Sequence, residues 1–148
     1  MSVARRLLIV VGLQREARLA GKGGVATVCS GGDVGLLERR LAGIDLGSVS
    51  GVVSFGLAGG LDATLAPGDL LLATAVAASS GTFGTDAALT DALAEALKSA
   101  GLRLSDGVFA GVDAAVLTPG DKATLRARTG AVAVDMESHV AARYAAAG

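Results

Sequence analysis

The chain has 148 residues, 51% of them hydrophobic and 18% charged, so it is long and apolar enough for one globular domain and is not a disordered chain. A net charge of −1 and only 3% aromatic residues exclude a basic surface for nucleic acid or anionic membranes and a platform for stacking bases. The single cysteine, Cys29, excludes an internal disulfide and a multi-cysteine metal site, and we expect a reduced, cytoplasmic compartment.

The first 55 residues predict strands separated by glycine-rich turns. Short runs of β-branched and leucine residues are typical of strands buried on both faces, and the first run is too short to span a membrane. The predicted strands are Arg6 to Gly12, Val25 to Cys29 and Gly51 to Phe55. Between them we expect a polar segment at Gly12 to Ala17, a turn at Gly21 to Gly24 and an amphipathic helix at Asp33 to Ala42.

The rest of the chain continues to alternate between strands and helices. The predicted strands are Asp69 to Ala78, Arg103 to Gly111 and Ala131 to Val134. The predicted helices are one capped by Thr85 and ended by Gly101, one from Pro119 to Arg128 with Thr118 as its N-cap, and one from Ser138 to Ala147. Leu61 to Gly68 and Ser79 to Gly84 read as connecting loops.

This alternation predicts an α/β fold in which helices flank a mainly parallel central sheet. No internal repeat or long linker interrupts residues 1–148, so we expect a single domain.

Two carboxylates stand where the last predicted strand meets the last helix. Asp135 and Glu137 follow Ala131 to Val134, at the carboxyl end of a strand, and ligands of open α/β sheets bind at that edge. Alternatively, both acids only favour the start of the helix through its dipole. The spacing leaves both interpretations open.

Two glycine loops are candidate ligand loops. The amides of Gly31 and Gly32, before a predicted helix, either cradle an anion or only form a tight turn. The loop from Gly56 to Gly60 lacks the G-x-G-x-x-G spacing and the first-strand position of a dinucleotide-binding fingerprint.

Four segments of the chain, taken together and in order, resemble the signatures of one family. They are Ser30 to Gly32, Ser54 to Leu61 followed by Pro67 to Asp69, Gly107 to Ala114, and Val134 to Glu137. The family is that of the nucleoside phosphorylases and nucleosidases, which includes purine nucleoside phosphorylase and methylthioadenosine/S-adenosylhomocysteine nucleosidase. A weaker fifth match, Gly12 to Glu16, places Glu16 with the nucleosidases' water-activating Glu after a one-residue shift. Asp135 to His139 and the opening at Gly12 are most similar to hopanoid-associated phosphorylase.

The resemblance implies a three-layer, phosphorylase/hydrolase-like fold and cleavage of the N-glycosidic bond of an adenine-type nucleoside. The implied substrate is adenosylhopane, cleaved by phosphate with release of adenine; the alternatives are hydrolysis of the methylthioadenosine type and a nucleoside-binding module without catalysis. Glu137 and Glu16 are then the catalytic candidates. The implied substrate contacts are Met136, Gly56, Ala58, Gly59, Asp113, Ala114 and Asp135, and the implied phosphate contacts are Gly31, Gly32 and Arg15.

The same resemblance implies no cofactor or metal, inorganic phosphate as co-substrate, and a homo-oligomer. The family's general acid is an Asp on a further strand, and no Asp follows Glu137 in this sequence. We therefore expect a C-terminally truncated chain, without the family's last strand and helix, that has little or no activity alone.

Overall fold

The computed structural model describes residues 5–23 and 25–148, which form two compact units. Unit 1 comprises Met1–Leu57 and Met136–Gly148, and unit 2 comprises Ala58–Asp135. The predicted turn at Gly21 to Gly24 is a 3-10 turn, η1 (Gly21–Gly23), and its last residue lies outside the described residues. That residues 1–148 behave as a single domain stays a prediction.

Unit 1 is built on a three-stranded parallel sheet in the order β2-β1-β3. Its strands are β1 (Arg6–Val11), β2 (Ala26–Cys29) and β3 (Val49–Ser54), which confirms the three strands predicted in the first part of the chain. Leu8 in the central strand pairs with Ala26 on one side and Val52 on the other. The central strand is therefore covered along both edges, as its uninterrupted apolar sequence indicates.

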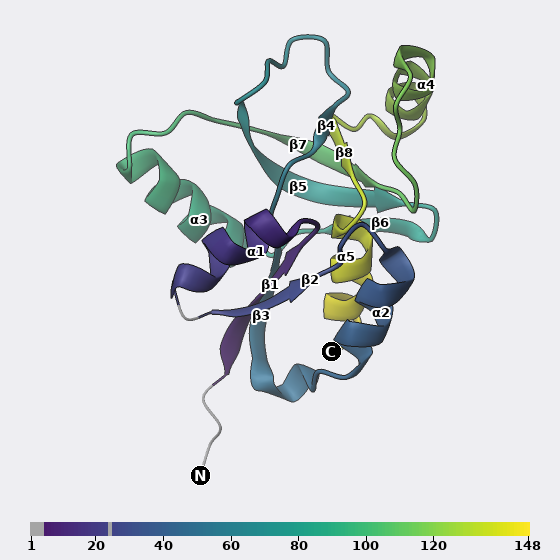
Figure 1. The fold of residues 1–148 in the computed structure, drawn as a ribbon. Coiled ribbons are helices and arrows are strands. Elements are labelled where there is room, and N and C mark those ends of the chain that lie inside the picture. The colour runs from purple at the N-terminus through teal and green to yellow at the C-terminus, as the bar shows by residue number, and fades with distance from the viewer. Residues whose placement is uncertain (1–4, 24) are drawn as a thin grey trace. The chain divides into compact units, whose positions relative to one another are not determined.

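Three helices accompany this sheet: α1 (Gln14–Ala20), α2 (Val34–Ala42) and α5 (Ser138–Ala146), with a 3-10 turn η2 at Leu46–Ser48. Helices α2 and α5 lie side by side, and α5 contacts β3 (Figure 1). The core between helices and sheet consists of Leu8, Val10, Leu37, Leu41, Val140 and Ala141. The predicted polar segment after β1 forms a short helix, α1, which the apolar periodicity of the sequence does not predict.

Unit 2 contains a five-stranded sheet in the order β4-β8-β7-β5-β6. Its strands are β4 (Gly59–Gly60), β5 (Leu70–Ala78), β6 (Gly81–Gly84), β7 (Leu104–Gly111) and β8 (Ala133–Asp135). Strands β5, β7 and β8 are parallel, whereas β4 and β6 pair antiparallel at the two edges. The two sheets together confirm the α/β class with mainly parallel strands and flanking helices.

The loop predicted at Ser79 to Gly84 is wrong, because Gly81–Gly84 forms β6, the return strand of a hairpin with β5. The chain reverses at Ser79 and Ser80, between the paired residues Ala78 and Gly81, and Gly81 has φ 131°, which glycine adopts readily. The predicted cap Thr85 is also wrong. Its hydroxyl donates to the Thr74 carbonyl (3.0 Å), and Asp86 caps the helix by accepting from the Leu89 amide (2.8 Å).

The helices of unit 2 are α3 (Ala87–Ser99) and α4 (Pro119–Thr129). Thr118 caps α4 as predicted, since its hydroxyl accepts from the Asp121 amide at 3.1 Å. Gly130 ends the helix with φ 70° and turns the chain toward β8. The core of this unit consists of Leu61, Ala110, Leu125, Ala131 and Val134.

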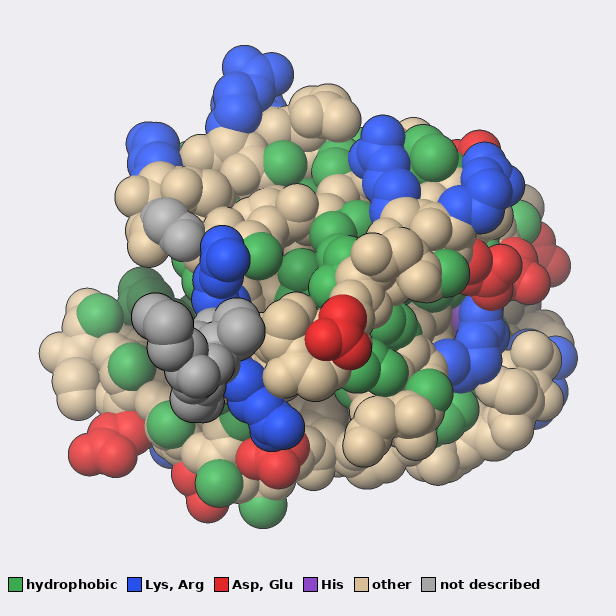
Figure 2. Space-filling view, turned by 90° about the horizontal axis from the view of Figure 1, so that it is seen from below, with side chains coloured by type: hydrophobic (Ala, Val, Ile, Leu, Met, Phe, Trp, Pro, Cys, Tyr) green, Lys and Arg blue, Asp and Glu red, His purple; other side chains and the backbone are tan. Residues whose placement is uncertain are grey.

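The described residues contain no helix that combines the length and apolarity needed to cross a membrane. On the face shown in Figure 2, acidic and basic side chains are interspersed among apolar and neutral ones. This mixture agrees with the net charge of −1.

Leu37 provides a test of the unit 1 core. Its side chain is 0% exposed in α2, so Leu37→Ala is expected to lower the free energy of unfolding by about 2–5 kcal/mol through lost burial and a residual cavity. The matched control is Leu19→Ala in α1, where the leucine is 57% exposed and the loss should stay within about 0.5 kcal/mol. Urea denaturation measures both, and equal losses would contradict this core.

Candidate functional site

Glu137 lies at the N-cap position of α5, and one residue, Met136, separates it from the end of β8. Its side chain makes no capping hydrogen bond to the helix backbone. Instead, Oε1 accepts a hydrogen bond from the hydroxyl of Ser30 at 2.8 Å, across 107 positions of sequence. The half-buried carboxylate is therefore held toward the end of β2, and capping of its own helix does not account for its position.

Gly12, the residue after β1, forms the floor beneath this carboxylate. A Cβ added at Gly12 would lie 3.2 Å from Oε2 of Glu137 and only 2.7 Å from Oε1, and the second distance is shorter than Cβ atoms show in folded proteins. Glycine at this position thus allows the carboxylate to approach the backbone closely and does not serve a turn.

Glu16 is the second carboxylate at this place, and it is only 7% exposed. Its Oε2 accepts from the amides of Gly12 (3.0 Å) and Leu13 (2.8 Å), and its Oε1 accepts from the amide of Leu57 (2.8 Å). A Cβ added at Gly56 would lie 2.7 Å from Oε1. Glu16 therefore fastens the loop after β1 to the loop after β3 and explains why the short helix α1 begins where it does.

The predicted phosphate loop is exposed at Gly31 and Gly32, which have φ 65° and 81°. The Gly32 amide donates to the Ser30 hydroxyl at 3.0 Å, and Asp33 caps α2 by accepting from the Leu36 amide at 2.8 Å. Local hydrogen bonds thus account for the turn. Arg15, the predicted phosphate cation, is exposed on α1.

The remaining predicted substrate contacts fall into both units. Gly56 is exposed and Met136 half-buried in unit 1. In unit 2, Ala58 is exposed and Gly59 pairs with Val134. The others gather at one edge of the unit 2 sheet, because Asp135 pairs with Gly111 and its carbonyl accepts from the Val112 amide at 3.0 Å, just before the exposed Asp113 and Ala114.

Sequence reasoning missed Ser30 as a side chain of the site. It noted the Ser30 to Gly32 loop for its glycines, yet the serine is 1% exposed and bonded to Glu137. A polar residue directly after a buried strand, at the edge where ligands of parallel sheets bind, was the available signal. The contact itself joins residues far apart in sequence and is visible only in the fold.

The chain also has one cysteine and one histidine, residue types that can bind a metal ion. Cys29 and His139 are buried in unit 1, at 6% and 2% exposure. Within the described residues, no three His, Cys, Asp or Glu side chains come together in a way that would hold a metal ion.

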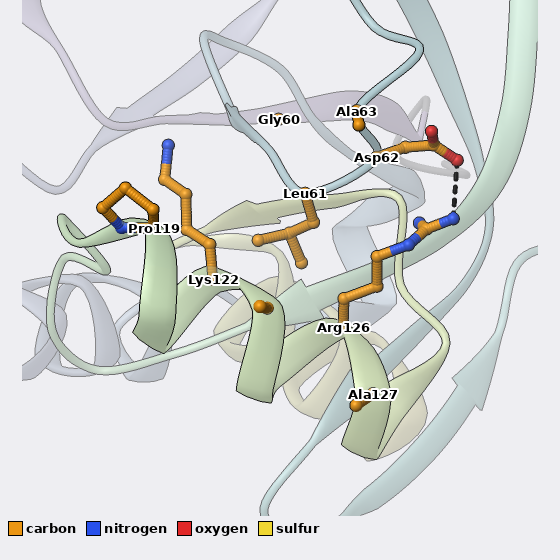
Figure 3. Close-up of a pocket in the computed structure, with 9 residues that line it drawn as sticks. Gly60, Leu61, Asp62, Ala63, Pro119, Lys122, Arg126 and Ala127 are labelled. Atoms are coloured by element: carbon orange, nitrogen blue, oxygen red, sulfur yellow. Dashed lines mark hydrogen bonds and ion pairs between the residues drawn. The ribbon is translucent and has the colours of Figure 1, made fainter.

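A separate cavity of about 520 Å³ lies in unit 2 between α4 and the segment after β4 (Figure 3). Asp62 and Arg126 form an ion pair on its wall, with Nη2 and Oδ2 at 2.7 Å. The amide and hydroxyl of Thr64 also bond to Asp62, and with the nearby guanidinium they hold the pKa of that carboxyl below its ordinary value. The lining contains none of the predicted site residues; it consists of Gly60, Leu61, Asp62, Ala63, Pro119, Lys122, Ala123, Arg126 and Ala127.

Comparison with solved structures finds the same fold in nucleosidases. A methylthioadenosine/S-adenosylhomocysteine nucleosidase from Helicobacter pylori, solved with 5′-methylthioadenosine in its active site, has a TM-score of 0.86 at 19% identity, covering 97% of this chain and 80% of that one. Futalosine hydrolase from the same species has a TM-score of 0.86 at 18% identity, covering 99% and 86%. The Campylobacter jejuni nucleosidase has a TM-score of 0.84 at 18% identity, covering 97% and 80%.

Comparison with curated protein sequences finds no match. A family model describes the sequence itself: residues 15–147 match the model of the phosphorylase superfamily. That match covers most of the chain, including α1 with Glu16, both glycine loops and the segment with Glu137. The chain therefore belongs to the phosphorylase superfamily.

Proposed function

We propose that the chain binds an adenine-type nucleoside and acts in cleavage of its N-glycosidic bond. The observation that carries the proposal is the half-buried carboxylate of Glu137, held by Ser30 over Gly12. Membership of the phosphorylase superfamily and a fold shared with nucleosidases support it.

The chemistry explains why a carboxylate is needed. Cleavage of a ribosyl C1′–N bond passes through a state that resembles an oxocarbenium ion, so negative charge near the sugar stabilises it. One carboxylate can accept hydrogen bonds from both the 2′- and the 3′-hydroxyl, and these bonds strengthen as positive charge develops on the ring. Glu137 takes this role in the proposal, and Met136 packs against the sugar.

For the acceptor we propose inorganic phosphate, and for the substrate adenosylhopane, which leaves a phosphorylated ribosyl-hopane and adenine. Support comes from the sequence resemblance and from the exposed position of Gly31, Gly32 and Arg15 in unit 1. The same proposal includes that the chain forms a homo-oligomer.

The proposed substrate contacts outside Glu137 and Met136 are Gly56, Ala58, Gly59, Asp113, Ala114 and Asp135. Most of them are glycines or alanines, so they contribute backbone groups and space rather than charge.

Hydrolysis is the second candidate, because a specific contact favours it. Glu16 accepts from the amide of Gly12, the same residue against which Glu137 lies, so two carboxylates share one short segment. Enzymes that hydrolyse glycosidic bonds usually use a pair of carboxylates. In this alternative Glu16 activates water, and phosphate is dispensable.

Replacing Glu137 by Gln keeps the shape of the side chain and removes its charge. We expect Glu137→Gln to bind adenosine about 10-fold or more weakly, since a hydrogen bond to a charged group contributes about 1.5–3 kcal/mol. Isothermal titration calorimetry measures the affinity. The matched control is Glu38→Gln on α2, where the glutamate is exposed and paired with Arg143. Adenosine affinity that survives Glu137→Gln would refute the role of Glu137.

Adding one methyl group at Gly12 tests the close packing under the carboxylate. Gly12→Ala places that methyl 2.7 Å from Oε1 of Glu137, so the carboxylate must move and adenosine affinity should fall at least as far as in Glu137→Gln. Gly21→Ala is the matched control, because an added Cβ there meets nothing within 4 Å. Equal adenosine affinities of the two alanine variants would show that the Glu137 carboxylate does not depend on the space left by Gly12.

The acceptor is decided by a single-turnover assay with the chain in excess over adenosine, with and without phosphate. We expect any adenine release to require phosphate and to yield a sugar phosphate. Release without phosphate, yielding the free sugar, would favour hydrolysis. Tight adenosine binding without any release would favour a nucleoside-binding module.

A further inference from the structure

Ser30 is a buried side chain that the proposed chemistry does not yet use. It lies directly after β2, is 1% exposed, and its hydroxyl oxygen has three polar neighbours. These are Oε1 of Glu137 at 2.8 Å, the Gly12 carbonyl at 3.4 Å and the Gly32 amide at 3.0 Å.

The distances determine where the single hydroxyl hydrogen goes. A serine hydroxyl donates one hydrogen, and both Glu137 and the Gly12 carbonyl are acceptors. The carboxylate is 0.6 Å closer (3.4 Å against 2.8 Å) and carries charge, so it receives the hydrogen bond. The Gly32 amide donates to the same hydroxyl, which polarises the group and makes it a better donor.

The result is a directed chain of hydrogen bonds from Gly32 through Ser30 to Glu137. At its end, the absent Cβ of Gly12 lets the carboxylate settle against the backbone after β1. The Glu137 side chain makes no cap bond to α5, and the Ser30 hydroxyl holds Oε1 from outside the helix.

We propose that Ser30 is a positioning residue that sets the Glu137 carboxylate for the two ribose hydroxyls of the nucleoside. This inference rests on the proposed function, since it assigns Ser30 to the ribose contact made by Glu137. A two-point contact with neighbouring hydroxyls depends on the direction of both carboxylate oxygens, and small misplacements of such groups are costly. Ser30 itself touches no reacting atom.

The test compares adenosine with 2′,3′-dideoxyadenosine, which lacks both hydroxyls. Ser30→Ala is expected to weaken adenosine binding roughly tenfold, the value of about one charge-assisted hydrogen bond, and to leave dideoxyadenosine binding unchanged. Cys29→Ala is the matched control: Cys29 is the buried neighbour whose thiol contacts the Gly12 carbonyl at 3.5 Å, and its loss should alter neither affinity.

Two further variants separate positioning from folding. Ser30→Cys keeps the shape of the side chain with a larger sulfur atom in place of the oxygen and donates only weakly, so it should lose adenosine affinity selectively even if Ser30→Ala fails to fold. Adding a Ser30 substitution to Glu137→Gln should cause no further loss of adenosine affinity, because both act through one contact.

Equal weakening of both ligands, or unchanged adenosine affinity in the Ser30 variants, would overturn the positioning role while the function of Glu137 stands. Wild-type protein that does not distinguish the two ligands would overturn the proposed function and this role with it. In that case, non-additive effects of the Ser30 and Glu137 substitutions on the free energy of unfolding would show that the hydrogen bond between them has a structural role only.

Discussion

The candidate site depends on the three ways in which one glycine meets its neighbours. The amide of Gly12 donates to Glu16, its carbonyl lies near the side chain of Ser30, and its missing side chain makes room for Glu137. Each contact reaches a different segment of unit 1. β1 is the central strand of a parallel sheet, so Gly12, the residue after it, has a fixed position. The segments at the ends of β2, β3 and α5 are held relative to this position. A single backbone position thus sets the spacing of two carboxylates.

The sequence predicted the elements whose patterns are strong and local. Strands such as β1 and β5 are rich in apolar residues, and α4 is bounded by Thr118 and Gly130, so their positions follow from hydrophobicity and capping. Strands β4 and β6 consist of two and four residues rich in glycine, and they exist because a neighbouring strand supplies the hydrogen bonds. Helix α1 is similar, since a buried glutamate fixes its start. Such elements follow from tertiary contacts, which a local pattern does not contain.

The carboxylates of the candidate site could be predicted from the sequence, but the residues that hold them in place could not. A glutamate after a buried strand is visible in the sequence, and in the fold Glu137 is bonded to Ser30, the residue after β2. Its partner Ser30 lies 107 positions away, and neither spacing nor composition links the two. Glu16 shows the opposite case: the family resemblance suggested catalysis, whereas the fold surrounds it with main-chain amides. The role of a buried polar group is set by its hydrogen-bond partners, which only the fold reveals.

These partners bear on how the glycosidic bond would be attacked. A general base must present an oxygen to water, but three amides occupy both oxygens of Glu16, and a carboxylate has only about four acceptor positions. Water activation by Glu16 would therefore use the last position of a side chain that is 7% exposed, or would break a bond that joins two loops. Phosphate carries its own negative charge and needs no base to become a nucleophile. The hydrogen bonding of Glu16 thus supports a structural role for this residue, in which it links the loop after β1 to the loop after β3.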